Sequence, residues 1–208
     1  SMEVRVIILK SICEKTFCAG ASFDELVAID DLEKGKVFFS GFAQVINACR
    51  TVDQLIIGRV QGKAVGGGVG IASAVDYCFA TQRAEVKLSE LAVGIGPFVV
   101  GPAVERKIGL SAMSELAINA TEWRSAEWAK SKGLYTEVFD SIEAMDEAVE
   151  TLAVRLSNSN PEAMNDLKKI FWQGTSHWDE LLEERAGISG RLVLSEFTRN
   201  AISAFKSK

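Results

Sequence analysis

The chain has few of the residues that build metal centres. It contains one histidine, His177, which excludes zinc sites built from several histidines. Its four cysteines are scattered without the spacing of a metal site, and they are Cys13, Cys18, Cys49 and Cys78. This usage is typical of buried or free thiols in a reducing compartment. We therefore expect a cytoplasmic protein with no bound metal.

Long apolar segments and excess positive charge are also absent. No apolar run reaches the roughly 18 residues that a membrane-spanning helix needs, and no signal peptide is visible. The net charge of −5 gives no reason to expect nucleic acid or an anionic membrane as a partner. With 48% hydrophobic and 25% charged residues, the 208-residue chain can bury a sizeable core as one large domain, or as a domain with a small appendage.

The stretch from Val60 to Glu90 carries three consecutive glycines, Gly66 to Gly68, between an expected strand and an expected short helix. It lacks the motifs of phosphate-binding turns. The nearest match to a P-loop, starting at Gly58, is one residue short and has no hydroxyl for magnesium, and the dinucleotide spacing G-x-G-x-x-G is not met. A nucleophile elbow is absent. The glycines therefore form either an oxyanion-binding cradle of backbone N–H groups or a patch that only lets the helix pack closely.

A second helix start lies near the N-terminus. Ser22, followed by Glu25, fits a capping box, so a helix should begin there. The residues before Ser22 are small, which again leaves backbone N–H groups bare at the entry to a helix. This segment is a second place that can hold negative charge.

Glu90 is a lone carboxylate at the start of an apolar, glycine-rich segment. A carboxylate in apolar surroundings tends to have a raised pKa, which suits proton abstraction. The alternative is an exposed or salt-bridged glutamate with a structural role.

The pattern of apolar residues predicts an α/β protein with parallel strands joined by right-handed crossovers. The C-terminal third is helical and has more apolar surface than one layer needs, as for a subunit interface. Expected strands cover 4–10, 55–60, 76–81, 85–88 and 134–139. Expected helices begin at Ser22 and cover 34–52, 69–75, 102–108, 111–119, 125–132, 141–157, 160–173 and 176 to the C-terminus.

Four motifs together resemble the crotonase (enoyl-CoA hydratase/isomerase) family. Residues 17–22 read F-C-A-G-A-S, where the family has F-x-A-G-A-D. The others are the glycine-rich 62–70 segment, the 88–97 segment with the later Lys107-Ile108-Gly109, and the 126–138 segment. Each motif is weak alone, but their order over nearly the whole chain is specific.

The resemblance implies a crotonase-like spiral of ββα units with a helical C-terminal trimerisation region. Residues 1–140 would form the core, without the strand pair and helix that usually precede it in the family. Residues 141–208 would form the helical region. The resemblance also implies an acyl-CoA thioester as partner, a homotrimer or dimer of trimers, and no cofactor beyond the coenzyme A of the substrate.

Site residues follow by position in the family motifs. The N–H groups of Ala21 and Gly67 fall where the family has its oxyanion hole, and Glu90 falls on the catalytic proton donor and acceptor. The residues expected to contact the substrate are Phe23, Leu26, Gly66, Gly70, Pro97 and Phe98.

One departure from the family concerns the chemistry. Family hydratases use two glutamates, and the first falls on Gly70, which has no side chain. A site with one carboxylate resembles the family's Δ3-Δ2 enoyl-CoA isomerases, in which one glutamate takes a proton from C2 and returns it at C4. Two alternatives stay open: a hydratase with a different second acid, or a catalytically inactive CoA-binding or scaffold homologue. A Clp-type serine protease is disfavoured, because Ser176 and His177 lie together at a helix start.

Overall fold

The computed structural model describes residues 4–206, which fold into two parallel β-sheets surrounded by helices. The larger sheet has the strand order β1-β3-β5-β7 and the smaller one β2-β4-β6. The strands are β1 (Val6–Lys10), β2 (Thr16–Cys18), β3 (Leu55–Val60), β4 (Lys63–Val65), β5 (Tyr77–Thr81), β6 (Val86–Lys87) and β7 (Glu137–Phe139).

Helices occupy the connections and the whole C-terminal third. They are α1 (Phe23–Val27), α2 (Leu32–Thr51), α3 (Gly67–Ala74), the 3-10 helix η1 (Glu90–Val93), α4 (Gly101–Ile118), α5 (Ala126–Ser131), α6 (Ile142–Ser157), α7 (Pro161–Phe171), α8 (Trp178–Leu192) and α9 (Glu196–Lys206). The predicted helix caps at Ser22, Ser141 and Asn160 are confirmed, since each side chain accepts a hydrogen bond from a backbone N–H of the following helix. Among residues 4–206, no helix combines the length and the apolar character needed to cross a bilayer.

The chain winds as a spiral in which each of the first three turns adds one strand to each sheet, and β7 then joins the larger sheet alone. Strands β1, β3 and β5 enter the larger sheet, and each is followed at once by β2, β4 or β6 of the smaller sheet. Every strand pair within the two sheets is parallel. The predicted α/β class with parallel strands is therefore confirmed.

The sequence pattern did not predict two of the strands. β2 and β4 are three residues long and belong to the smaller sheet, and such short segments carry too few residues to show a period of two. The helices predicted at 102–108 and 111–119 form one element, α4. Gly109 at φ 79° and ψ 160° marks the break between them.

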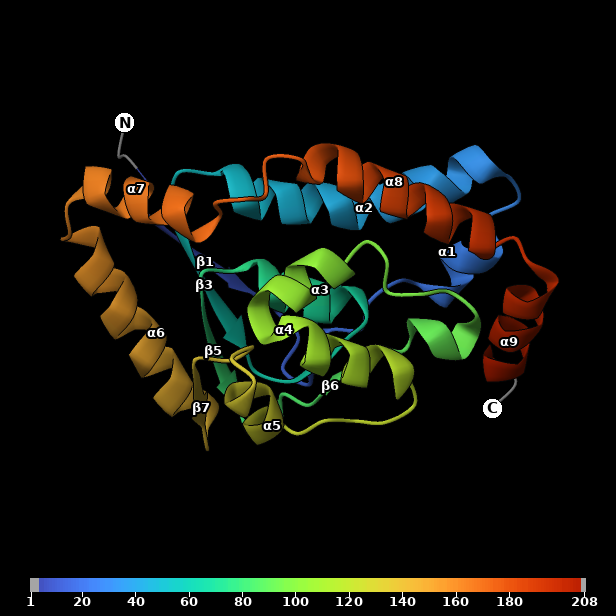
Figure 1. Cartoon of the computed structure of the whole chain (residues 1–208). Coiled ribbons are helices and arrows are strands. Elements are labelled where there is room, and N and C mark those ends of the chain that lie inside the picture. Colours follow the sequence, from blue (N-terminus) through green and yellow to red (C-terminus); the bar gives the residue numbers. More distant parts are fainter. Residues whose placement is uncertain (1–3, 207–208) are drawn as a thin grey trace.

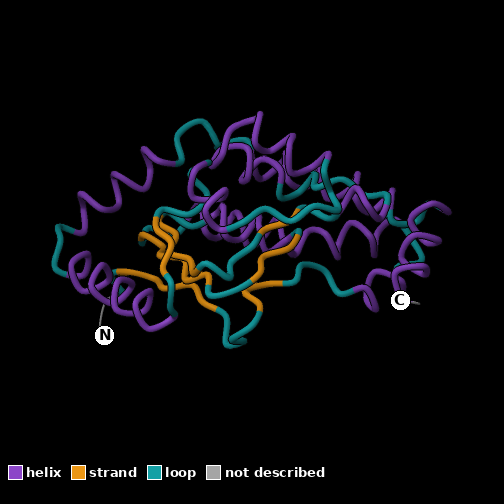
Figure 2. Tube along the Cα trace, turned by 90° about the horizontal axis from the view of Figure 1, so that it is seen from below, coloured by secondary structure: helices purple, strands orange, loops and turns teal. Residues whose placement is uncertain are grey.

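The helices pack in layers around the sheets. In Figure 1, α2 and α8 lie side by side along one side of the molecule and α6 runs beside the larger sheet. Figures 1 and 2 both show the strands gathered toward one end, with α9 at the other. Helix α9 packs on η1 and α1, so the C-terminal end of the chain reaches the segment that carries Glu90.

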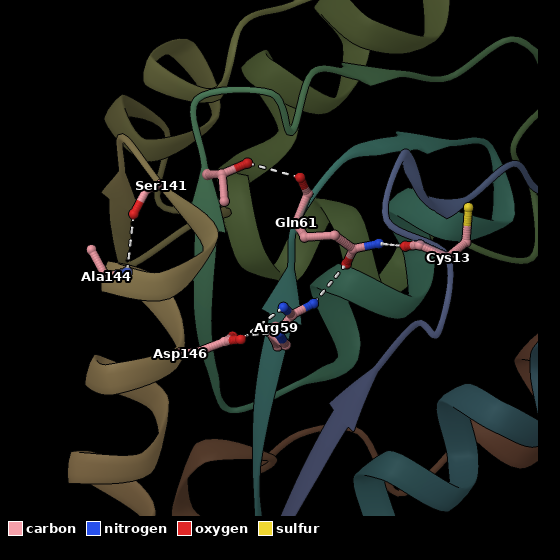
Figure 3. Close-up of polar contacts among 7 residues, drawn as sticks. Cys13, Arg59, Gln61, Ser141, Ala144 and Asp146 are labelled. Atoms are coloured by element: carbon pink, nitrogen blue, oxygen red, sulfur yellow. Dashed lines mark hydrogen bonds and ion pairs between the residues drawn. The ribbon is translucent and has the colours of Figure 1, made fainter.

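Polar contacts fix the larger sheet to its surroundings (Figure 3). Arg59 of β3 donates two hydrogen bonds to the carboxylate of Asp146 on α6. The buried Gln61 donates to the carbonyl of Cys13, and its own carbonyl accepts from Thr81 Oγ1 at 2.8 Å. These contacts join the end of β3 to the β1–β2 loop, to β5 and to α6.

A buried ion pair anchors α7. Asp76 accepts hydrogen bonds from Lys168 Nζ at 2.6 Å, from Trp172 Nε1 at 3.0 Å and from the backbone N–H of Ile56 at 2.8 Å. The Asp76 and Lys168 side chains are only 5% and 3% exposed. Because a buried charge is tolerated only when it is paired and hydrogen-bonded, this network fixes the C-terminal helical region to the sheet.

Helices α2 and α8 approach each other closely where two glycines meet. A Cβ built on Gly35 would lie 2.7 Å from the carbonyl oxygen of Gly190, and a Cβ on Gly190 would lie 2.6 Å from the backbone nitrogen of Lys36. Any side chain at either position would separate the helices. Gly187, one turn earlier on α8, has nothing within 4 Å of the same built position.

We expect Gly190→Ala to lower the free energy of unfolding by about 1–3 kcal/mol, because the added methyl overpacks the α2–α8 contact. Gly187→Ala is the matched control on the same helix. It should be neutral or stabilising by up to about 1 kcal/mol, because alanine is the better helix former. Urea unfolding of the three proteins measures both effects. Equal stability of the two variants would show that the helices can separate without cost.

Candidate active site

A cavity of about 700 Å³ lies between the two helix starts singled out in the sequence. Its wall comes from the turn after β2, from α1 and α2, from the β4–α3 junction, from the β6–η1 segment and the loop after it, and from α8 and α9. The residues that line it include Ala21, Phe23, Leu26, Phe42, Val65, Gly66, Gly67, Lys87, Ser89, Glu90, Pro97, Phe98, Val100, Thr121, Trp123, Ala201 and Ala204.

The β4–α3 junction gives the cavity a wall of bare backbone. Gly66 has φ 53° and ψ −115°, a conformation that residues with a side chain rarely adopt, and it turns the chain from β4 into α3. A Cβ on Gly67 would lie 2.0 Å from Cε1 of Phe42, so the phenyl ring packs directly on the Gly67 backbone. Because the first residues of α3 are glycines, they have no side chains that could cover the N–H groups at the start of this helix.

The turn after β2 meets this helix start. Gly20, at φ 82°, brings its backbone so close that a Cβ on it would lie 3.4 Å from the nitrogen of Gly67. Ala21 therefore stands next to the start of α3, and both Ala21 and Gly67 line the cavity. No acceptor within residues 4–206 takes the N–H of either residue. An oxyanion hole is built from backbone donors of this kind on one wall of a cavity.

Glu90 is the acidic side chain of the cavity. It occupies the first position of η1, and its Oε1 lies 3.0 Å from the point where a Cβ on Gly66 would stand. Its Oε2 is buried and accepts no hydrogen bond from any described residue. Burial raises the pKa of the Glu90 carboxyl from 4.5 to about 7, and the residue's own backbone N–H lowers it by less. Such a carboxyl can both take up and release a proton near neutral pH.

The rest of the wall is mostly apolar. Phe23, Leu26, Pro97 and Phe98, expected from the sequence to contact a substrate, all line the cavity. Among the described residues of the lining, the charged side chains are Glu90 and one lysine. No three His, Cys, Asp or Glu side chains within residues 4–206 stand close enough together to hold a metal ion.

Gly70 is the predicted substrate contact that does not reach the cavity. It lies one turn into α3, and a Cβ on it would stand 2.4 Å from Cγ1 of Val100. Val100 is 4% exposed and forms part of the cavity wall. The space that a side chain at position 70 would need is therefore filled by a valine.

Sequence reasoning missed three groups of lining residues. Phe42 belongs to the apolar stripe of α2, and nothing in that stripe distinguishes a cavity residue from a core residue. Lys87 alternates with two fully buried apolar residues, a pattern that predicts the opposite face of the strand but no ligand. Trp123 lies in a loop, and Ala201 and Ala204 come from α9, whose docking on η1 has no local signal.

Known proteins resemble this chain along almost its whole length. The sequence model described as Enoyl-CoA hydratase/isomerase matches residues 1–205. The short-chain-enoyl-CoA hydratase of Clostridium acetobutylicum is 28% identical over 208 residues, which are 99% of this chain and 78% of that enzyme. The carnitinyl-CoA dehydratase of Escherichia coli K12 is 32% identical over 173 residues, which are 81% of this chain but only 64% of that enzyme.

A solved structure agrees with the fold. The crystal structure of an enoyl-CoA hydratase/isomerase from Mycobacterium paratuberculosis superposes with a TM-score of 0.84, at 18% identity, over 98% of this chain and 81% of that one. The crotonase-type spiral predicted from the sequence is therefore confirmed as the fold.

The raised pKa of Glu90 makes stability depend on pH. Below its ordinary value of 4.5 the carboxyl is protonated in both the folded and the unfolded chain, and its contribution to stability is complete. As the pH rises through about 7, the unfolded chain ionises more readily and this contribution is lost. Glu90→Gln should therefore match the wild type at pH 4.5 and exceed its free energy of unfolding by about 1–3 kcal/mol at pH 8.

Thermal unfolding of both proteins between pH 4.5 and pH 8 measures this difference. The control is Glu105→Gln, because Glu105 is exposed on α4, and its curve should run parallel to that of the wild type. A constant gap between Glu90→Gln and the wild type across this pH range would mean that the Glu90 carboxyl is solvated in the folded protein.

Proposed function

The chain belongs to the enoyl-CoA hydratase/isomerase family, and on that premise we propose that it isomerises 3-enoyl-CoA to 2-enoyl-CoA with Glu90 as its single acid and base. The observation that carries the proposal is the contact between Gly70 and Val100. A hydratase of this family needs a second carboxylate at position 70 to hold water. Here an apolar side chain fills the space that this carboxylate would need.

In the proposed reaction the thioester oxygen accepts hydrogen bonds from the N–H groups of Ala21 and Gly67. As the proton leaves C2, the thioester becomes an enolate and its oxygen gains negative charge. Two fixed donors and the N-terminus of α3 stabilise that charge, and removing one such donor typically costs about 3 kcal/mol. The bare backbone at Gly66 and Gly67 supports this role, because a side chain at either position would displace Glu90 or the ring of Phe42 from the cavity wall.

Glu90 takes the proton from C2 and returns it at C4. Its carboxylate stands beside the glycine wall, so the thioester held there and the base meet at the same point of the cavity. A pKa of about 7 is near the pH at which the proton has to be both gained and released, and this supports one residue in both steps. Oε2 of Glu90 accepts no hydrogen bond from any described residue, so no such bond has to break when the carboxylate takes the substrate proton.

The apolar lining supports a fatty acyl chain as the group that enters the cavity. Phe23, Leu26 and Phe98 offer contact surface, and Pro97 shapes the loop beside them. The helical residues 141–208 remain the part of the chain where we expect copies to associate, as a homotrimer or a dimer of trimers. A cytoplasmic location also remains an expectation, from the scattered free cysteines.

Hydration is the second candidate, because similar enzymes carry the names hydratase and dehydratase. A hydratase reading needs a second acid that reaches the water molecule. The lining offers the hydroxyls of Ser89 and Thr121 but no second carboxylate among the described residues. A hydroxyl is a far weaker acid than a carboxyl, so the observed lining favours isomerisation.

Glu90→Gln should lower the kcat of isomerisation by about 10²–10⁴-fold, because it removes the general base while keeping the shape of the side chain. The assay follows conversion of 3-enoyl-CoA to 2-enoyl-CoA in heavy water, with mass spectrometry of the product. In the wild type, deuterium should enter at C2 or C4 without addition of water. The rate should rise with pH through about 7, because only the carboxylate form of Glu90 accepts the proton.

The control for this assay is again Glu105→Gln, which should retain full activity. Rapid formation of 3-hydroxyacyl-CoA from 2-enoyl-CoA by the wild type would contradict isomerisation and establish a hydratase. Unchanged turnover in Glu90→Gln would instead contradict the role of Glu90, whichever product forms. If the wild type binds CoA thioesters but turns none of them over, the result would favour a catalytically inactive homologue.

The contact between positions 70 and 100 can be tested by supplying the missing acid. Gly70→Glu alone should destabilise the protein, because its Cβ would stand 2.4 Å from Val100. Gly70→Glu with Val100→Gly removes the obstacle and should raise the rate of hydration of 2-enoyl-CoA by about 10²-fold or more. Val100→Gly alone is the control and should not hydrate. A folded double variant that gains no hydration would mean that position 70 does not face the reacting carbons.

A further inference from the structure

The cavity contains a cation that the proposed reaction does not use. We infer that Lys87, together with Trp123, forms a subsite for a carboxylate carried by the acyl group of the thioester. The substrate would then be the monothioester of a dicarboxylic acid. The inference rests on the proposed function, which gives the position of the thioester. The position of the positive charge comes from the residues of the cavity wall.

Strand pairing fixes the position of Lys87. It is the last residue of β6, and its register partner on β4 is Val65, which directly precedes the glycine wall. The backbone carbonyl of Lys87 also accepts a hydrogen bond from the N–H of Gly66 at 2.9 Å. Val86 and Leu88 are fully buried on the other face, and Lys87 lines the cavity. A cation is thus held one strand away from the proposed thioester site.

The charge of Lys87 has no anionic partner within residues 4–206. Its Nζ lies 4.4 Å from the ring centroid of Trp123, which also lines the cavity. Lys63 approaches the same ring at 4.2 Å, but it pairs with Glu85 at 3.2 Å and does not line the cavity. Of the two lysines at this ring, only Lys87 therefore has its charge available to a ligand.

The surroundings of Lys87 suit a small anion. A cation–aromatic contact keeps an ammonium group in place but leaves its charge uncompensated. Ser89 lines the same cavity, and its hydroxyl can donate a hydrogen bond to a carboxylate oxygen. The hydroxyl of Thr121, which also lines the cavity, donates to Glu122 Oε1 at 3.3 Å. A charge-assisted hydrogen bond in a largely apolar cavity is stronger than one in water.

Distance favours the acyl group over coenzyme A as the source of the anion. Neighbouring strands lie about 4.8 Å apart, so the backbone of Lys87 is close to Gly66 and Gly67, where the thioester oxygen would bind. Acyl substituents begin at that carbonyl. The phosphates of coenzyme A are separated from it by the whole length of the pantetheine arm.

The test measures binding of saturated thioesters, which cannot be isomerised. Succinyl-CoA, glutaryl-CoA and adipoyl-CoA are titrated calorimetrically against butyryl-CoA, pentanoyl-CoA and hexanoyl-CoA, so that each pair differs in the terminal carboxylate. The wild type should bind at least one carboxylated member more tightly than its partner. Lys87→Met should weaken that member by about 30-fold or more and change the uncharged partner by less than about 3-fold.

Two further variants separate charge from structure. Lys63→Met alters the same ring environment outside the cavity and should leave both members of each pair unchanged. Lys87→Arg keeps the positive charge and should recover most of the preference. Thermal unfolding of each variant checks that the fold is intact.

Each other outcome overturns the inference. Equal weakening of both members of every pair by Lys87→Met would mean that the lysine holds a phosphate of coenzyme A. No preference for any carboxylated thioester in the wild type would mean that the lysine has no ligand role in the acyl site. Failure of the proposed isomerisation is separate, because a protein can bind glutaryl-CoA through Lys87 and yet leave 3-enoyl-CoA unchanged.

Discussion

The site depends on the close approach of other segments to the bare backbone of Gly66, Gly67 and Gly68. A Cβ at any of these positions would stand within 3.0 Å of atoms of Glu90, Phe42 or Cys18, which come from three different parts of the chain. The end of β2, the middle of α2 and the start of η1 can therefore meet only because three side chains are missing at one strand–helix junction. The same absence exposes the N–H groups at the start of α3. The packing and the proposed ligand binding thus have one cause, and a methyl group at Gly67 would affect both.

Two buried carboxylates differ in whether hydrogen-bond donors compensate their charge. Asp76 is almost completely buried, but a lysine, an indole and a backbone N–H all donate to it. Its charge is compensated, and it fixes α7 to the sheet. Glu90 has a buried oxygen that no described residue donates to, and burial raises its pKa to about 7. An uncompensated carboxylate reduces the stability of the fold, and it persists here at the wall of the candidate site.

The sequence allowed the long elements and the glycine wall to be predicted, because both have local signals. Apolar residues recur at helical spacing over the twenty residues of α2. The caps Ser141 and Asn160 have side chains that accept hydrogen bonds from backbone N–H groups of the following helix. β2 and β4 have no such signal, since pairing with neighbours distant in the chain defines three-residue strands. The roles given to Ala21, Gly67 and Glu90 came from family resemblance and remain predictions. Lys87, Trp123 and the α9 residues could not be found, because only tertiary packing brings them to the cavity.

The two charges of the cavity can coexist because they do not neutralise each other. The pKa of Glu90 is set by burial and by its own backbone N–H, and no lysine contributes to it. A cation paired with Glu90 would lower that pKa and make the carboxylate a weaker base. Lys87 instead lies against the face of Trp123, which holds its ammonium group in place without supplying a negative charge. One ligand could therefore place an anionic group at Lys87 and exchange a proton with Glu90. A carboxylate at one end of an acyl chain would orient the chain, while the glycine wall holds its thioester at the other end.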